Sequence, residues 1–127
     1  MDFNNVYPRP HMTIADVVGL VLHVTDIQYR WSFPRYIPVR DIALMNTRFE
    51  VVFLRVWDMH IAHHITCFRR VEAKLHCLAA TFLKINRNIG GVVTTYASYL
   101  IFQPTIAQAM ELEDLREILI NREQVLR

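Results

Sequence analysis

VRDIALMNTRFEVVFLRVWD, residues Val39–Asp58, is the segment on which the predicted architecture of this chain of 127 residues rests. It predicts two strands joined by a tight polar turn over residues 46–48. In the second strand the side chains alternate between two faces. One face is uniformly aliphatic and is expected to lie against a core; it comprises Val52, Leu54 and Val56. The opposite face comprises Val51, Phe53, Arg55 and Trp57.

This second strand ends with an arginine and a tryptophan on one face, because Arg55 and Trp57 are two residues apart. A strand that buries one side and exposes this pair on the other makes a stacking platform for a flat, anionic ligand. The alternative is that Trp57 only covers the end of a barrel. Alternation by itself leaves both interpretations open.

Upstream of this hairpin the chain holds a β-rich run and an aromatic segment. The run Val17–Val24 has Gly19 in its middle, and an isolated glycine in a strand predicts a bulge or a sharp bend. Residues 29–38, YRWSFPRYIP, contain Pro34 and Pro38. Proline cannot donate to a central ladder, so this segment is expected to be a loop or an edge.

Downstream, a short helix is predicted over Met59–Arg70, strands over Leu75–Ile85 and Val92–Phe102, and a second helix after Pro104. A turn over residues 86–91 separates the last two strands. Five β segments with a helix between the third and fourth are the layout of an OB-fold. We therefore expect an all-β fold with accessory helices, a five-stranded Greek-key barrel with a C-terminal helix. Propensity leaves an α+β sandwich of other topology open.

The composition fits one globular domain, because 53% of the residues are hydrophobic and 20% are charged. No apolar run approaches the roughly 18 residues needed to cross a bilayer, so no membrane partner is expected. The first residues lack the basic and apolar regions of a secretory signal. We expect an extended lead-in over residues 1–12, the OB-fold domain over 13–104 and the helix over 105–127.

Charge is unevenly distributed along the chain. Residues 1–104 hold 11 Lys and Arg against 7 Asp and Glu, whereas residues 105–127 hold 3 against 5. A mildly basic body followed by an acidic segment is compatible with phosphate binding by the body. The net charge of +2 is too small to prove a nucleic-acid partner.

The residues themselves resemble a known family over roughly Ile14–Leu115. The run ADVVGLVLHV…VRDIAL…EVVFLRVWD…GGVVTTYASYLIFQPTIAQAMEL is similar to the second DNA-binding OB domain of the replication protein A large subunit, and within that family to the plant versions. The most specific parts are Asp16–Gly19, Arg40-Asp41, Val56-Trp57, and Pro104-Thr105-Ile106 followed by Ala109.

This resemblance implies sequence-tolerant binding of single-stranded DNA without catalysis, a role in DNA replication, repair or recombination, and a nuclear location. Trp57 falls on the position of a base-stacking aromatic residue of the family. The family's second stacking aromatic precedes a glycine in the loop between strands four and five. Here that loop reads Arg87-Asn88-Ile89-Gly90, so an aromatic ring is missing and Arg87 is the candidate replacement.

Single-strand binders pair a positive groove with aromatic faces, and two segments beside Trp57 could form its walls. Residues 29–38 interleave aromatics with arginine, although they could also fold onto the barrel as a hydrophobic loop. Residues 84–91 are basic, and Gly90 and Gly91 there either admit a ligand or simply make a turn. The predicted nucleic-acid-binding residues are Trp57, Arg55, Trp31, Arg35, Arg30, Lys84 and Arg87.

The predicted helix over residues 59–70 also contains weak candidates for a zinc site. His60, His64 and Cys67 have helical spacing, and imidazole and thiolate suit zinc. Adjacent His63 and His64 diverge by about 100° on a helix, however, so the whole cluster cannot converge. We therefore expect surface histidines and a buried Cys67, without a metal.

No catalytic or cofactor motif is found in the sequence. It contains no Ser/His/Asp arrangement, no P-loop and no dinucleotide fingerprint. We expect neither an enzyme nor a cofactor.

The C-terminal helix has an apolar stripe that comprises Leu112, Leu115, Leu119 and Leu126. The stripe either plugs the end of the barrel or pairs with another subunit's helix, as helices after OB domains do in replication protein A. Ile118, Ile120 and Val125 lie off the stripe, which favours a partner or self-association. The rival function is therefore a protein-interaction module that has lost most of its DNA affinity, and a family fragment or paralogue is compatible with either function.

Overall fold

The computed structural model describes residues 14–64 and 66–126, so the expected lead-in over residues 1–12 lies outside the described residues. The elements follow one another in the order β1 (Ile14–Val24), β2 (Gln28–Ser32), β3 (Arg35–Met45), β4 (Val51–Trp57), α1 (Met59–His63), α2 (Cys67–Ala73), β5 (Cys77–Asn86), β6 (Gly91–Val93), β7 (Tyr99–Phe102) and α3 (Ala107–Leu126).

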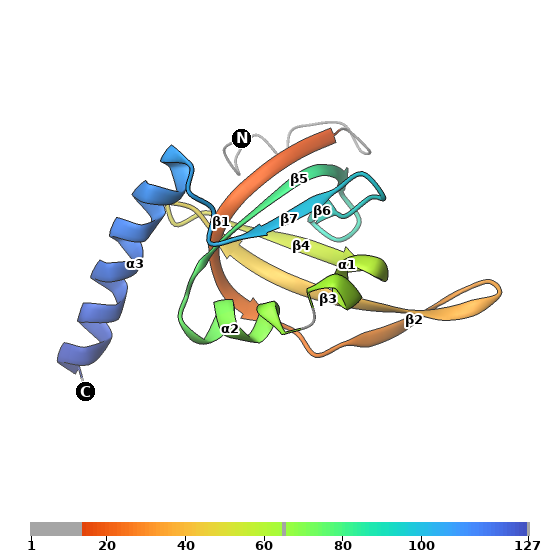
Figure 1. The fold of residues 1–127 in the computed structure, drawn as a ribbon, viewed down its shortest axis with the longest axis horizontal. Coiled ribbons are helices and arrows are strands. Elements are labelled where there is room, and N and C mark those ends of the chain that lie inside the picture. Colours follow the sequence, from red (N-terminus) through yellow and green to blue (C-terminus); the bar gives the residue numbers. More distant parts are fainter. Residues whose placement is uncertain (1–13, 65, 127) are drawn as a thin grey trace.

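The strands close into a small barrel (Figure 1). The first half of β1 pairs antiparallel with β5, and its second half pairs antiparallel with β3. β4 pairs antiparallel with β3 and parallel with β6, while β5 pairs with β6 and β7. With α1 and α2 between β4 and β5 and α3 at the end, this topology confirms the predicted OB-fold.

β1 serves both halves of the barrel because it bends on either side of Gly19. The pairing register shifts over residues 15–17 against β5 and over residues 21–23 against β3. Such shifts insert an unpaired residue and bend the strand. Gly19 itself is buried and stays in register with Leu78. The predicted bend is therefore present, but it does not fall on the glycine.

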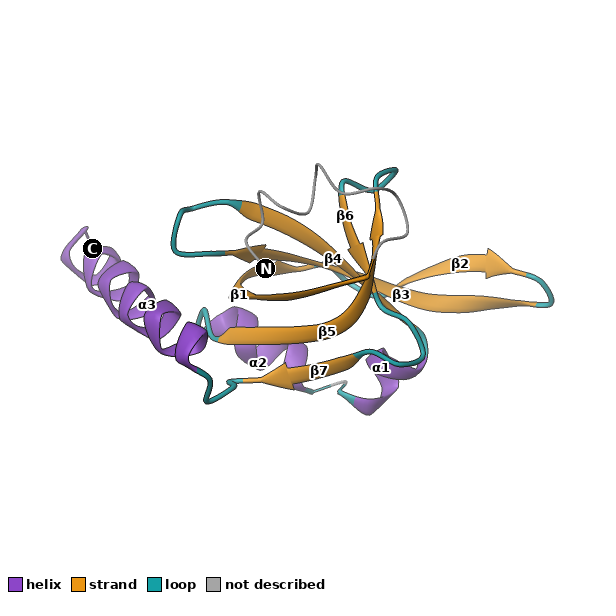
Figure 2. Ribbon diagram, turned by 90° about the horizontal axis from the view of Figure 1, so that it is seen from above, coloured by secondary structure: helices purple, strands orange, loops and turns teal. Residues whose placement is uncertain are grey.

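The proline-containing segment over residues 29–38 is an edge hairpin. Among the described strands, β2 pairs with β3 alone, and Tyr29 lies opposite Pro38. The hairpin projects from the barrel at the end opposite α3, as both ribbon views show (Figure 2). The prediction of a loop or an edge is thus refined, because the segment forms regular strands outside the central ladder.

The core confirms the predicted alternation of β4. Val52, Leu54 and Val56 are fully buried, and each such side chain contributes roughly 1.5–3 kcal/mol of hydrophobic stabilisation. Phe68 of α2 is buried in the same core, and the Arg40 guanidinium lies 5.2 Å from its ring centroid. Where one helix was expected over residues 59–70, two short helices are found.

α3 packs on the barrel through the leucine stripe. Leu112 is buried and Leu115 and Leu119 are partly buried against a second cluster that includes Leu20 and Cys77. The side chain of Leu126 lies outside the described part of the structure. The stripe that was proposed for a partner is therefore used, over its first three leucines, within the chain itself. No helix among the described residues is both long and apolar enough to span a membrane.

Candidate nucleic-acid interface

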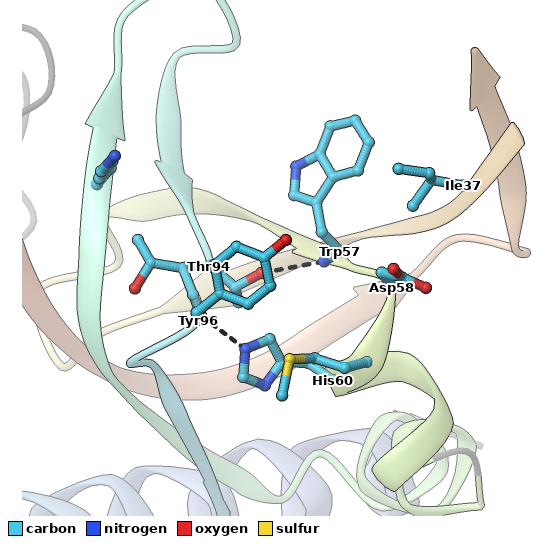
Figure 3. Close-up of a pocket in the computed structure, with 9 residues that line it drawn as sticks. Ile37, Trp57, Asp58, His60, Thr94 and Tyr96 are labelled. Carbon is cyan, nitrogen blue, oxygen red and sulfur yellow. Dashed lines mark hydrogen bonds between the residues drawn. The ribbon is translucent and has the colours of Figure 1, made fainter. Parts of the chain in front are cut away.

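Trp57 ends β4 at a surface pocket of about 310 Å³ (Figure 3). The Trp57 backbone N–H donates to Oγ1 of Thr94 at 3.0 Å, which ties the end of β4 to the segment after β6. The indole ring is partly exposed and projects into the pocket. The residues that shape this pocket include Ile37, Trp57, Asp58, His60, Lys84 and Tyr96.

Arg55, which shares the face of Trp57, is held by an acidic partner. It lies opposite Asp41 on β3, and its guanidinium donates from Nε to Oδ1 at 2.8 Å and from Nη2 to Oδ2 at 3.0 Å. The hydrogen bonds with Asp41 raise the pKa of Arg55 above its ordinary value against the opposing effect of burial. Arg55 is thus held in place by Asp41 on the face of β4 that carries Trp57.

Arg35 at the tip of the β2–β3 hairpin is paired in the same way. Its Nη2 donates to Oδ2 of Asp58 at 2.8 Å, so its side chain bridges from the hairpin to the residue after Trp57. Arg30 is also on the hairpin, where Nη2 donates to Oε1 of Gln28 at 3.5 Å. Asp58, which lines the pocket, and Asp41, which shares the face of Trp57, are therefore each compensated by an arginine.

Lys84 is the cation that lines the pocket without a counter-charge. Within the part of the chain that the structure describes, its ammonium group has no ion-pair partner. Arg87 follows the pocket-lining Lys84 by three residues and is exposed in the loop between β5 and β6. With the neighbouring acids neutralised, Lys84 gives this face a positive character that suits phosphate.

The two glycines after Arg87 have structural roles. Gly90 has φ of 67°, a left-handed conformation that closes the turn without a side-chain penalty. At Gly91 an added Cβ would lie 2.0 Å from the carbonyl oxygen of Phe53, because β6 approaches β4 closely there. The turn interpretation of these glycines fits this geometry.

Trp31 and Trp57 are placed on opposite faces. Directly opposed residues of an antiparallel pair share a face, and Val39 lies opposite Trp57. Trp31 lies opposite Tyr36, which is three residues from Val39 along β3 and therefore points the other way. The Trp31 ring, 60% exposed, instead packs edge-on against Tyr36 with centroids 5.0 Å apart.

The pocket contains an aromatic residue that sequence reasoning missed. Tyr96 is 93% exposed and lies across the pocket from β4. The strand predicted over residues 92–102 is interrupted here by a turn, in which the Thr95 N–H donates to Oγ of Ser98 at 2.8 Å. The run of hydroxyl residues around Tyr96 was the available signal, because Ser and Thr side chains compete with strand hydrogen bonds.

His63 is exposed as predicted, but His60 and Cys67 do not occupy the expected positions. His60 was predicted on the helix surface but is only 6% exposed, and its Nε2 donates to the carbonyl oxygen of Thr95 at 2.8 Å. Cys67, expected to be buried, is partly exposed at the start of α2. The break between α1 and α2 separates His60 from Cys67. Among the described residues, no three His, Cys, Asp or Glu side chains gather as a metal site.

A closed barrel with a bent first strand and helices between β4 and β5 defines an OB-fold domain, and solved structures share its fold. A chain of a replication protein A heterotrimer, solved bound to single-stranded DNA, superimposes with a TM-score of 0.80 at 18% sequence identity. The match covers 92% of this chain and 27% of that chain, so the present chain spans about a quarter of its length. No curated protein matches the sequence.

The chain belongs to a domain family of unknown function, DUF8448, whose model matches residues 1–93. That match includes β1 to β6, and hence Trp57 and Lys84 of the pocket, whereas Tyr96 and α3 lie beyond it.

Proposed function

We propose that this domain binds single-stranded DNA without regard to sequence and without catalysis. One base stacks on Trp57, and Lys84 and Arg87 contact the phosphates. The observation on which this rests is the partly exposed Trp57 ring in a pocket that also holds Lys84. The acid that lines this pocket, Asp58, is paired with Arg35, whereas Lys84 has no ion-pair partner among the described residues. Stacking on aromatic rings beside a positive groove is how sequence-tolerant single-strand binders work.

The fold supports this proposal, because the replication protein A chain that shares it was solved bound to single-stranded DNA. The sequence resemblance to the second DNA-binding domain of the large subunit, in its plant-like version, leads to the same proposal. On this basis we further propose a nuclear role in DNA replication, repair or recombination. Trp31, Arg30 and Arg35 remain predicted contacts of the projecting hairpin.

The direct test is fluorescence anisotropy of a labelled oligo-dT of about 16 nucleotides, the upper end of the site size of an OB domain. We expect saturable binding that weakens as salt rises, because phosphate contacts release counterions. Trp57→Ala should weaken binding by about five-fold or more, the equivalent of about 1–3 kcal/mol for one stacked base. Absence of binding at low salt by a folded domain would contradict the proposal.

A second candidate function is a protein-interaction module that uses α3. The leucine stripe faces the barrel, but Met110 and Ile118 of α3 are exposed, and large exposed apolar side chains are available for a partner. Sedimentation of the chain and of Ile118→Asp tests self-association. A concentration-dependent dimer that Ile118→Asp abolishes would favour this function. Dimerisation through such an apolar contact should change little as salt rises.

A further inference from the structure

The pocket beside Trp57 has a second ring, Tyr96, on its other side. Both rings project into the same pocket, from two segments that are far apart in the sequence (Figure 3). Within the described part of the chain neither ring contacts another aromatic ring. The space between Trp57 and Tyr96 is therefore not filled by a direct stack of the two side chains.

The turn that presents Tyr96 is held firmly at its base. The Thr95 hydroxyl donates to the carbonyl of Phe82 at 3.0 Å, and the Ser98 hydroxyl donates to the same oxygen at 2.8 Å. The His60 Nε2 also donates to the Thr95 carbonyl, at 2.8 Å. Because the residues on both sides of Tyr96 are anchored, its exposed ring is positioned by the fold even though the side chain itself has few neighbours.

The size and lining of the pocket suit a single small planar group. Its volume of about 310 Å³ is at the lower end of the range of about 300–1,000 Å³ found for ligand pockets. Ile37 and the two rings supply apolar surface, and Lys84 stands at the wall where a phosphate would lie. A nucleobase with its own phosphate presents this combination of a flat apolar face and a negative charge.

We propose that Tyr96 is the second stacking residue of this domain and that the pocket takes one unstacked nucleobase between Trp57 and Tyr96. This inference rests on the proposed binding of single-stranded DNA. It also locates the aromatic ring that the loop over residues 87–90 lacks, since Tyr96 offers a ring from the turn between β6 and β7 instead. The base enters from the open side of the pocket, and its phosphate contacts Lys84.

The test compares Tyr96→Ala and Tyr96→Phe with Tyr99→Ala in the same oligo-dT titration. Tyr99 is a matched control, because it is 72% exposed, lies three residues away and does not line the pocket. We expect Tyr96→Ala to weaken binding by about five-fold or more, and Tyr96→Phe and Tyr99→Ala to stay within about two-fold of wild type. Equal melting temperatures would show that the variants fold.

The double variant Trp57→Ala/Tyr96→Ala asks whether both rings contact the same base. If one base lies between the two rings, removing the second ring after the first costs little more. The fold-loss of affinity in the double variant should then be smaller than the product of the two single fold-losses. Independent, fully multiplicative losses would overturn the single pocket.

The outcomes for this inference and for the proposed function are distinguishable. If wild type binds and Trp57→Ala weakens binding while Tyr96→Ala matches Tyr99→Ala, Tyr96 has no stacking role and only this inference fails. If folded wild type does not bind oligo-dT at low salt, both proposals fail.

Discussion

Arg55 and Asp41 face each other across β3 and β4 and are joined by two hydrogen bonds, Nε to Oδ1 at 2.8 Å and Nη2 to Oδ2 at 3.0 Å. Both side chains are largely withdrawn from solvent, and they lie on the same face as Trp57. A bidentate pair in this position has two effects, because it stabilises the sheet and it also neutralises a cation on the face of Trp57.

Asp41→Asn separates these two effects. The variant keeps the shape of the side chain but removes its charge, so we expect the free energy of unfolding to fall by about 1–2 kcal/mol. Oligo-dT affinity should rise, since Arg55 gains freedom and one negative charge leaves the groove. Urea unfolding and anisotropy measure the two quantities. A weaker affinity in a stable variant would mean that Asp41 is needed to aim Arg55 at the ligand.

Lys84→Gln tests the phosphate contact. For single strands the slope of log K against log salt changes by about 0.7 for each phosphate neutralised, so this variant should have a shallower slope by about that amount. Binding should weaken similarly for oligo-dT, oligo-dA and oligo-dC, because a phosphate contact does not read the base. Lys74→Gln is the matched control, since Lys74 is an exposed lysine at the end of α2. An unchanged slope for Lys84→Gln would remove this residue from the interface.

Trp31→Ala measures whether DNA stays on one face of the β2–β3 hairpin. Because Trp31 points away from the face of Trp57, we expect a smaller loss of affinity than the five-fold or more expected for Trp57→Ala. The titration of both variants with the same oligo-dT gives the comparison. Equal losses would indicate a strand that wraps around the hairpin and contacts its aromatic side as well.

The barrel was predictable because its signals are local and periodic. Alternation in β4 placed Val52, Leu54 and Val56 in the core and Trp57 on the other face, and the structure confirms both features. The order of strands and helices then allowed an OB-fold and few other topologies.

The pocket was less predictable because its parts meet only through tertiary contacts. The hydroxyl residues around Tyr96 hint at a turn, but they do not show where the ring lies. The turn is held by the distant Phe82 carbonyl and the His60 side chain. The arginines illustrate the same limit. The sequence identified Arg35 and Arg55 as cations but not their acidic partners. Asp58, the partner of Arg35, follows β4, and Asp41, the partner of Arg55, lies on β3.

The reactivity of Cys77 reports whether α3 stays packed on the folded barrel. Burial is the main cause that raises the pKa of its thiol to about 12, so almost no thiolate is present near pH 8. We expect an alkylating reagent to modify Cys77 only when the barrel and α3 separate or unfold, whereas the partly exposed Cys67 reacts in the native protein. Mass spectrometry after timed labelling, with and without urea, shows the order. Fast native labelling of Cys77 would mean that α3 opens readily.

The stability of the fold should decrease in mild acid. Burial lowers the pKa of both His64 and His76. Neighbouring histidines lower the pKa of His64 further. Arg116 lowers the pKa of His76 further, whereas Glu113 raises it. An unfolded histidine binds a proton near pH 6.5, so between the folded and unfolded pKa values the unfolded chain holds more protons. The corresponding stability is complete above about pH 6.5 and is lost as the pH falls through the lower folded pKa.

The pH effect is measured as the urea midpoint of wild type, His64→Gln and His76→Gln between about pH 7.5 and 5.5, a range that spans the unfolded histidine pKa. Each variant should lose part of the acid-dependent decrease, because the group that titrates has been removed. His76 lies beside α3, where Arg116 donates from Nε to the carbonyl of Lys74 at 2.8 Å. Its protonation would therefore weaken the contact of the helix with the barrel, and labelling of Cys77 should accelerate at the lower pH relative to a free-thiol standard. A decrease that is identical in all three proteins would assign the acid sensitivity to other groups.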